Sequence, residues 1–547
     1  MADALADENY QVSARLRYAG PNVLMYIDTA FDAETPQENI ERAAQDFEQR
    51  IYPRSQELFG RERSPGVDGD PRLTILNTDV RGAGGYFSSA DGVTTQVNRF
   101  SNQRDMFVIS AGADWIGTPD YSATLAHEFQ HMIEWNVARR SPSWFNEGLS
   151  TLSEDLFGYV GQSTAELHLA EPDIQLTAWA ADSATTGRHY GTSNLFMRYI
   201  HEHYGGDAVL SELIQLDAGN DTSAFVAVAQ RTRADIDSFD DIVADWAVAN
   251  TLNDSAVGDG RFAYALLPST IEPAEAGASA AADVAQYGAD YLQLPRGPTA
   301  LRFDGADTVP LVGALPADGR YAWWSNAGDD SIQTLTRAFD LRSLQQATLQ
   351  LSLWHEIELN YDYGYAAVST DDGATWTTLA GGTTTTEDPQ GANLGAGLTG
   401  LSGVPEADIQ QGERGRWIEE QLDLTPFVGQ EILLRFLMVS DAAVSGAGMM
   451  IDNIRIPELN YVDGVEQGDS GWQANGFARV DGELPQQWAL RLIRQGPGGT
   501  SVEPLPVDSQ GRTGLVLREG ERGVLVVMGA TPFTRERASY TYQVEQR

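Results

Sequence analysis

The chain has 547 residues, too many for one hydrophobic core, so its length predicts two to four domains. Its formal net charge of −42 favours solubility and disfavours nucleic acid and anionic membranes as partners. The sequence contains neither cysteine nor lysine, which excludes disulfides, thiolate chemistry, Schiff-base chemistry and a Walker-type phosphate loop. No apolar run reaches the length of a transmembrane helix, so we expect no membrane insertion.

The first part of the chain alternates between strand-like and helix-like stretches. Residues 35–51 have apolar side chains at helical spacing, with Pro36 suited to the first turn and Pro53 marking the expected end. Three apolar runs have strand length, at residues 22–29, 72–77 and 106–110.

The next segment predicts a helix that carries metal-ligand spacing. Thr118 can cap this helix and Pro119 suits its first turn. His127 and His131, four residues apart, lie on one face, where two imidazoles can bind one zinc ion. Glu128 beside them can activate water as a general base. The opposite face is apolar, with Leu125, Phe129, Met132 and Ile133.

A second helix is predicted after a turn at residues 139–141. A catalytic zinc ion takes three protein ligands and keeps one position open, and Glu147 on this helix is the predicted third ligand. Glu154 lies two turns further along the same face and is predicted to accept the free N–H of a ligand histidine. The alternative is an amphipathic helix pair with histidines on its surface.

The motif HEFQHMIEW followed by WFNEGLS resembles the gluzincin metallopeptidases, and among them the hyicolysin-type branch. The resemblance implies that His127, His131 and Glu147 bind zinc and that Glu128 is the general base. It also implies an α+β zincin fold, in which an edge strand binds the substrate backbone, and residues 86–97 are our candidate for that strand. The elongated metzincin motif is not matched, because Glu134 and Val137 stand where it needs glycine and a ligand.

Helical patterns continue at residues 193–204 and 239–250. In gluzincins a tyrosine or histidine of this region donates a hydrogen bond to the tetrahedral oxyanion. The segment YGTSNLFMRYI resembles the one that carries such a tyrosine, so Tyr190 is the candidate donor and His189 the second choice. The alternative is a tyrosine packed at the start of a helix.

The pattern changes after residue 273 from helices to short alternating strands with Gly, Asn and Asp turns. The sequence therefore predicts a multidomain chain, an α+β peptidase domain followed by all-β sandwich (jelly-roll) modules. The expected divisions are a peptidase domain at 1–273, a linker at 274–286, a β-sandwich at 287–457 and a small C-terminal β-sandwich at 458–547.

The third of these segments has a resemblance of its own. It contains WWSNAGDDSIQTLTRAFDL, NYDYGYAAVSTDDGATW, GANLGAGLTGLSG and MMIDNIRIP, which resemble the jelly-roll module that follows the peptidase in immune inhibitor A proteins. Where such modules bind calcium, acidic side chains and backbone carbonyls are the ligands. The candidates here are Asp329, Asp330, Glu358 and Asp452, and the alternative is turn-forming acids in an acidic protein.

The combined hypothesis is a zinc endopeptidase that acts on protein or peptide substrates. An aminopeptidase is disfavoured, because the chain lacks a GxMEN-like segment. The first residues lack the apolar region of a signal peptide, so the protein is either cytosolic or a mature form with an added Met1. We expect the second, a secreted protein, because of the β-sandwich modules that follow the peptidase domain. The alternatives are a binding or adhesion protein with a structural or inactive zinc domain, whose β-modules bind a polymer or a cell-surface ligand, and a zinc hydrolase with a non-peptide substrate.

Overall fold

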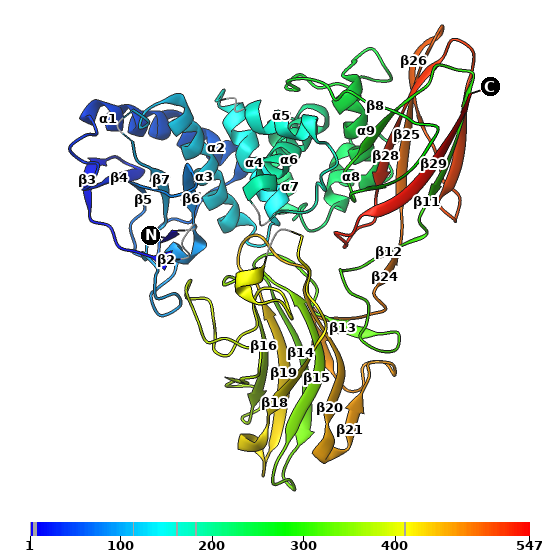
Figure 1. Cartoon of the computed structure of the whole chain (residues 1–547). Coiled ribbons are helices and arrows are strands. Elements are labelled where there is room, and N and C mark those ends of the chain that lie inside the picture. The colour runs from blue at the N-terminus through cyan, green and yellow to red at the C-terminus, as the bar shows by residue number, and fades with distance from the viewer. Residues whose placement is uncertain are drawn as a thin grey trace. The chain divides into compact units, whose positions relative to one another are not determined.

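The computed structural model describes residues 2–3, 8–112, 114–159, 162–180, 183–409 and 412–546. The chain divides into two compact units (Figure 1). Unit 1 comprises Met1–Asp307, Pro485–Pro532 and Arg537–Arg547, and unit 2 comprises Thr308–Leu484 and Phe533–Glu536. Among the described residues, no helix has both the length and the apolar character needed to cross a membrane.

Unit 1 begins with a five-stranded mixed sheet in the order β3-β4-β5-β7-β6. Its inner strands are parallel, and its edge strands β3 and β6 are antiparallel to their neighbours. The strands predicted at residues 22–29, 72–77 and 106–110 are confirmed. The bounds are β3 Ala14–Ala19, β4 Val23–Asp28, β5 Leu73–Thr78, β6 Gly85–Phe87 and β7 Met106–Ser110, preceded by the short pair β1 Ala2–Asp3 and β2 Glu8–Asn9.

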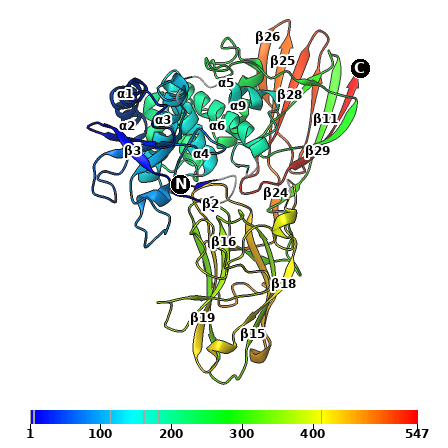
Figure 2. The same ribbon diagram turned by 60° about the vertical axis from the view of Figure 1, so that its left-hand side comes forward.

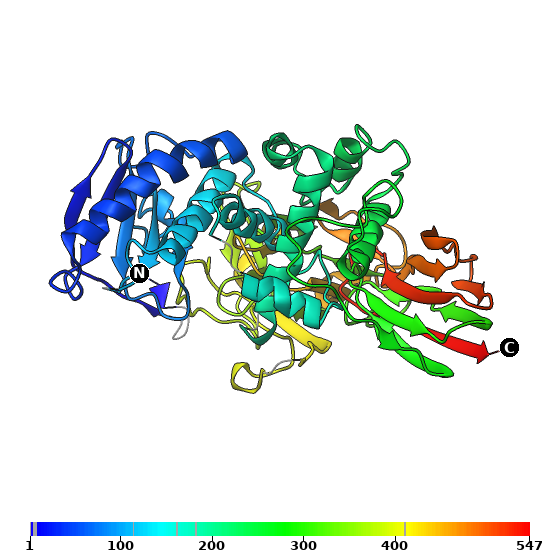
Figure 3. The same cartoon turned by 90° about the horizontal axis from the view of Figure 1, so that it is seen from above.

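Helices cover one face of this sheet (Figure 3). The first, α1 (Gln37–Asp46), continues through a π-helical turn at Phe47–Ile51 into α2 (Tyr52–Phe59). The prediction that this helix ends at Pro53 is wrong. Pro53 lies in the first turn of α2, where a proline costs little because its missing N–H would have no partner within the helix.

Helix α3 (Pro119–Val137) packs on the sheet and on α2, and the helices after it form a second layer around α6 (Ser183–Tyr204). The helices predicted at 193–204 and 239–250 are confirmed, but α6 starts ten residues earlier than predicted and therefore includes Tyr190. The other bounds are α4 Ser143–Leu156, α5 Gln162–Ala170, α7 Asp207–Gln215, α8 Ser223–Ala229 and α9 Phe239–Leu252.

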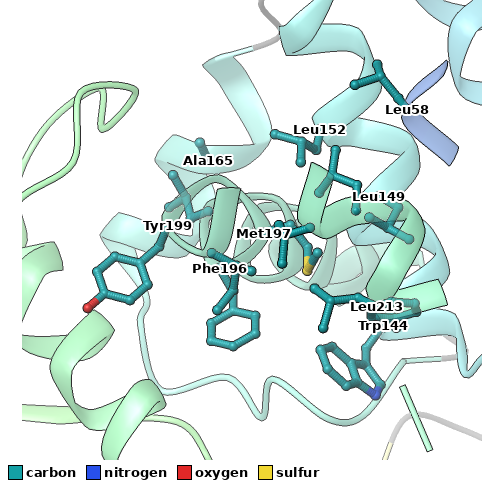
Figure 4. Packing of buried hydrophobic residues seen from close by; sticks show 14 of the residues in the cluster. Leu58, Trp144, Leu149, Leu152, Ala165, Phe196, Met197, Tyr199 and Leu213 are labelled. Carbon is teal, nitrogen blue, oxygen red and sulfur yellow. The ribbon is translucent and has the colours of Figure 1, made fainter. Parts of the chain in front are cut away.

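Gly148 allows α4 and α6 to approach each other closely. A Cβ atom at Gly148 would lie 2.9 Å from Met197 Cγ and 3.1 Å from the carbonyl oxygen of Ser193. Figure 4 shows Leu149 and Leu152 of α4 in the same buried cluster as Phe196 and Met197 of α6. This packing fixes the helix that carries Glu147.

A β-sandwich completes unit 1 (Figures 1 and 2). Its two sheets have the orders β26-β25-β28-β10-β8 and β27-β11-β29-β9 and enclose a core that includes Leu301, Phe303, Leu492 and Leu525. The bounds are β8 Ala274–Glu275, β9 Ser279–Val284, β10 Asp290–Leu294, β11 Thr299–Gly305, β25 Trp488–Gly496, β26 Gly499–Pro504, β27 Arg512–Leu517, β28 Arg522–Gly529 and β29 Ala538–Gln546.

This sandwich corrects two of the expected divisions. The predicted linker at 274–286 carries strands, and β9 pairs with β29 from Ala538↔Val284 to Gln543↔Ser279. The segment 458–547 is not a separate sandwich, because its strands β27, β28 and β29 pair with strands of residues 274–305. Alternating patterns indicate strands but not their partners, and here the partners lie far apart in the sequence, with unit 2 inserted between them.

The sandwich of unit 1 also packs on α9. The Tyr291 hydroxyl donates to the Ala247 carbonyl at 2.9 Å, and Arg491 pairs with Asp241 at 2.8 Å. Val526 and Met528 of β28 belong to the same buried cluster as Val243 and Ala247. The expected division at residue 273 therefore crosses a continuous core.

Unit 2 is a second sandwich, with the sheet orders β18-β15-β20-β13-β23, to which β21 adds through β20, and β17-β16-β19-β14-β22. Side chains of both sheets share one apolar core, and β19 alternates between buried and half-buried positions over most of its length. The bounds are β13 Ala322–Trp324, β14 Ile332–Asp340, β15 Thr348–Glu356, β16 Tyr363–Ser369, β17 Thr377–Thr378, β18 Ile418–Asp423, β19 Glu431–Val439, β20 Gly448–Ile456, β21 Tyr461–Asp463, β22 Gln473–Asn475 and β23 Ala478–Val480, with the short pair β12 Thr308–Pro310 and β24 Glu483–Pro485.

Candidate metal centre

The two histidines of the HExxH motif lie side by side on α3. The hydroxyl of Thr118 accepts a hydrogen bond from the backbone N–H of Tyr121 at 3.2 Å, and Pro119 follows in the first turn. The apolar face of this helix is buried, with Phe129 and Ile133 fully inaccessible. The rings of His127 and His131 are consequently held on the opposite face, with centroids 4.7 Å apart.

Both imidazoles point their Nε2 atoms at one carboxylate oxygen on α4. The distances from Glu147 Oε2 are 3.2 Å to His127 Nε2 and 3.5 Å to His131 Nε2. Glu147 Oε2 is buried and has no hydrogen-bond partner among the described residues. Three potential ligand atoms thus lie within 4.8 Å of one another, as the short turn between the helices predicts.

The Nδ1 atoms of both histidines, on the ring side away from Glu147, each contact a polar side chain. Glu154 Oε1 lies 2.7 Å from His127 Nδ1, where the sequence places it. His131 Nδ1 contacts Asn146 Oδ1 at 2.8 Å and Ser150 Oγ at 3.0 Å. An acceptor at Nδ1 keeps the proton there and leaves the Nε2 lone pair free for a metal ion.

Asn146 and Ser150 are not among the residues predicted from the sequence. Asn146 directly precedes Glu147, and Ser150 follows Asn146 by one helical turn, so both face α3. The i,i+4 spacing within Asn-Glu-Gly-Leu-Ser is the signal that could have found them.

The electrostatics of the cluster favour a cation. Burial alone would lower the pKa of His127, but Glu147 and Glu154 outweigh it and raise that pKa well above its usual value. Burial would likewise lower the pKa of His131, but the charge of Glu147 outweighs it and raises that pKa above its usual value. Burial alone would raise the pKa of Glu147, but the two histidines outweigh it and hold this pKa far below its usual range. The histidines therefore tend to hold protons that face the Glu147 carboxylate, and a divalent ion can take the place of these protons between the same atoms.

Glu128 lies beside the cluster and under the edge of the sheet. Its side chain is only 5% exposed, and the backbone N–H of Phe87 in β6 lies near enough to its carboxylate to stabilise the charged form. Burial raises the pKa of Glu128, which brings the carboxylate closer to the basicity of a general base. The edge strand ends at Phe87, so the stretch 86–97 is a strand only at its beginning.

Tyr190 is the oxyanion-donor candidate that the structure brings to the cluster. Its ring lies 6.2 Å from that of His127, and its hydroxyl is close enough to the carboxylate of Glu147 for that charge to act on its pKa. Burial and then the charges of Glu147 and Glu128 raise the pKa of Tyr190 well above its usual value, which keeps the hydroxyl protonated as a donor. His189 is buried beside Trp179, with ring centroids 5.7 Å apart.

A second acidic cluster lies in unit 2, and its membership differs from the sequence prediction. Carboxylate oxygens of Glu358, Asp362 and Asp441 lie within 4.8 Å of one another. Asp362 directly precedes β16, and Asp441 lies two residues after the end of β19. The pairing Tyr363↔Val439 brings both to the same end of the sheet. The sequence analysis missed both residues.

Only some of the predicted calcium candidates lie at this cluster. Glu358 belongs to it, and the charges of Asp329 and Asp330 act on Asp441. Asp452 lies elsewhere, fully buried in the middle of β20, where it accepts from the backbone N–H of Asp318 at 3.1 Å and of Asn453 at 2.7 Å. These bonds give Asp452 a structural role, and Asp452 is not part of the cluster that contains Glu358.

Comparison with known proteins finds a match for the inserted module. Residues 307–482 match the family model described as "Immune inhibitor A-like, MAM domain". This segment is therefore similar to the MAM domain of immune inhibitor A-like proteins. The resemblance predicted for residues 287–457 is confirmed, and the match starts and ends later, in agreement with the bounds of unit 2.

Three curated relatives cover parts of the chain. They are the pre-pro-metalloprotease PrtV of Vibrio cholerae (28% identity, 32% of this chain and 18% of the relative), the neutral metalloprotease ShpI of Staphylococcus hyicus (25%, 40% and 54%) and immune inhibitor A of Bacillus thuringiensis subsp. alesti (30%, 30% and 22%). The chain thus spans between about a fifth and a half of the length of these relatives. Two of the three are named metalloproteases, which supports the predicted resemblance to metallopeptidases.

Proposed function

We propose that this protein is a secreted zinc-dependent endopeptidase with β-sandwich accessory modules. The observation that carries the proposal is the convergence of His127 Nε2 and His131 Nε2 on Glu147 Oε2, an oxygen without a hydrogen-bond partner among the described residues. Relatives named metalloproteases support it. The substrate is a protein or peptide.

The donor set fits zinc. Two neutral imidazoles and one carboxylate are a common catalytic zinc set, and the described residues supply three such groups without an obvious fourth. Bound zinc supplies Lewis acidity, polarising a carbonyl group and lowering the pKa of water. His127, His131 and Glu147 would hold it, with Glu154 and Asn146 fixing the two imidazoles.

The chain's own residues account for the proton transfers. Glu128 takes the proton of the attacking water and delivers it to the leaving amine, while the backbone N–H of Phe87 keeps its carboxylate oriented. The Tyr190 hydroxyl turns from Glu147 to the oxyanion that forms at the substrate carbonyl. Among the described residues, strand β6 pairs only with β7, at the edge of the sheet, so its other edge can pair with an extended substrate backbone.

Replacing Tyr190 by phenylalanine tests the donor assignment. The Tyr190→Phe variant should lose about 10²-fold or more in kcat with zinc content unchanged, since one oxyanion donor disappears and no ligand does. Steady-state kinetics on a quenched peptide, with metal analysis of the same sample, measures both. An unchanged kcat would transfer the role to His189 or to another residue.

The competing functions are a binding or adhesion protein with an inactive zinc domain, whose β-modules grip a polymer or cell-surface ligand, and a zinc hydrolase with a non-peptide substrate. A structural zinc site usually has a fourth protein ligand. The burial of the Glu128 carboxylate beside the cluster is unexplained by a structural site and is expected for a general base. A casein or gelatin assay separates the peptidase from both.

We further propose that unit 2 binds calcium at Glu358, Asp362 and Asp441. Asp362 is completely buried, and its Oδ2 atom has no hydrogen-bond partner among the described residues. Burial and the charge of Asp441 raise the pKa of Asp362 to about 8. The ionised form of Asp362 is therefore disfavoured by its surroundings, and a bound cation would stabilise it. Calcium takes roughly six to eight oxygen ligands, and carboxylates together with backbone carbonyls suit it.

The calcium proposal predicts a calcium-dependent gain in stability that requires Asp362. In zinc-loaded, calcium-free wild type, added calcium should raise the Tm, because binding stabilises by about 2.7 kcal/mol at a hundredfold excess over Kd. The Asp362→Asn variant should lose this shift yet be at least as stable without calcium, since it removes repulsion between carboxylates. Calorimetry with a calcium titration measures both quantities.

Asp452→Asn is the matched control, because Asp452 is a buried carboxylate of the same module outside the cluster. It should keep the calcium shift. Loss of the shift in Asp452→Asn but not in Asp362→Asn would contradict the ligand assignment.

A further inference from the structure

The loop between α5 and α6 carries an aromatic side chain that holds Tyr190. Trp179 meets the Tyr190 ring edge-on, with centroids 4.9 Å apart and planes at 82°. The Tyr190 ring also lies near that of His127, with centroids 6.2 Å apart. Tyr190 therefore contacts Trp179 closely and lies next to a metal-ligand candidate.

This loop, residues 171–180, is anchored at its start and in its middle. Arg188 of α6 pairs with Glu171 at 2.6 Å, and Leu176 is fully buried in the main core of unit 1. The ring contact between Trp179 and Tyr190 joins the end of the stretch 171–180 to α6. These contacts are local, since they join the loop to the helix that follows it.

The remaining anchor comes from the C-terminal end of the chain. Asp173 Oδ1 accepts a hydrogen bond from the backbone N–H of Ala285 at 2.8 Å, and Asp173 Oδ2 pairs with Arg537. Arg537 also pairs with the carboxylate of Asp283 and donates to its carbonyl oxygen at 2.9 Å. A Cβ atom at Gly288 would lie 3.1 Å from both Asp173 Oδ1 and Ile174 N, so the sandwich backbone lies directly against the loop.

We propose that Trp179 is a positioning residue for Tyr190 and that the sandwich of unit 1 sets its position through the clamp formed by Asp173, Ala285 and Arg537. The proposal rests on the proposed function, because it concerns the oxyanion donor of that site. It assigns the strands after residue 485 a part in catalysis, as the support of a loop at the metal centre.

The physical basis is the geometry that a donor needs. A hydroxyl stabilises an oxyanion only within a narrow range of distance and direction, so a ring that rocks in a loose pocket loses part of its effect. An edge-on aromatic contact restrains a ring without a hydrogen bond. Arg537 is half exposed, and one such ion pair alone is weak, but here it acts together with the backbone bond at Ala285.

A double-mutant cycle with Tyr190→Phe tests the proposal in the full chain. We expect Trp179→Ala to lower kcat by roughly 3- to 10-fold with little change in KM, Trp179→Phe to recover most of the loss, and Arg537→Gln to lower kcat by about 2- to 5-fold. In the Tyr190→Phe background both substitutions should have almost no further effect, because their route to the substrate has been removed.

Hydrogen exchange provides a readout that does not depend on activity. In metal-free protein, Arg537→Gln should speed amide exchange in peptides that cover residues 171–180 by several-fold, with the core strands unchanged. Arg512→Gln is the control, because Arg512 makes an exposed ion pair with Asp508 in the same sandwich. It should change neither exchange nor kcat.

The outcomes separate the inference from the proposed function. If Tyr190→Phe is fully active, the donor assignment fails. The other case is an impaired Tyr190→Phe variant. If Trp179→Ala and Arg537→Gln then lower kcat as much in the Tyr190→Phe background as in the wild type, the positioning role is overturned. Unchanged exchange at residues 171–180 in Arg537→Gln would overturn the clamp.

Discussion

Replacing Glu128 by glutamine should abolish peptide hydrolysis while zinc stays near one equivalent. Glutamine keeps the shape of the side chain but cannot accept the proton of the attacking water or return it to the leaving amine. The rate should fall by several orders of magnitude, since one residue performs both proton transfers. The side chain is buried against the N–H of Phe87 and is not one of the three converging ligand atoms, so the metal should remain.

The control for this variant is its melting behaviour. A neutral amide in place of a buried carboxylate whose pKa is raised by burial should leave the Tm at or above that of the wild type. Loss of zinc from Glu128→Gln would show that the ligand assignment is wrong. Retained zinc with normal hydrolysis would remove Glu128 from the mechanism.

Replacing Glu147 by alanine should have the opposite pattern, with zinc and activity lost together. Glu147 supplies the one carboxylate among the three converging groups, and its oxygen lies between the two imidazole nitrogens. A site left with two histidines should bind zinc far more weakly, so purified protein should contain much less than one equivalent. Plasma emission spectrometry measures the metal, and excess zinc should restore little activity.

Glu166→Ala is a suitable control for Glu147→Ala, because Glu166 is an exposed glutamate on the neighbouring helix α5. It should keep both zinc and activity. Full zinc content in Glu147→Ala would move the third ligand to another residue.

The local parts of the site could be predicted from sequence because their geometry is helical. The spacing of His127 and His131, the cap at Thr118 and the distance from Glu147 to Glu154 each follow from 3.6 residues per turn. The short turn at residues 139–141 limits how α3 and α4 can face each other. Asn146 and Ser150 obey the same rule and were overlooked, although the pattern contains them.

The long-range parts could not be predicted in the same way. Alternation indicates strands within 488–546, whereas the small residues of 274–284 are typical of a linker, and neither pattern indicates that β9 pairs with β29 across the insertion of unit 2. The members of the acidic cluster in unit 2 could not be predicted for the same reason. Asp362 and Asp441 meet because β16 and β19 are neighbours in one register, and no local pattern distinguishes them from Asp452 on β20.

The most direct test of the central claim is a paired measurement of zinc content and quenched-peptide hydrolysis on the same samples of wild type, Glu128→Gln and Glu147→Ala. We predict one equivalent of zinc with activity in the wild type, one equivalent without activity in Glu128→Gln, and neither in Glu147→Ala. A wild-type protein that holds zinc and cleaves no peptide under any condition would contradict the peptidase assignment and favour the binding protein.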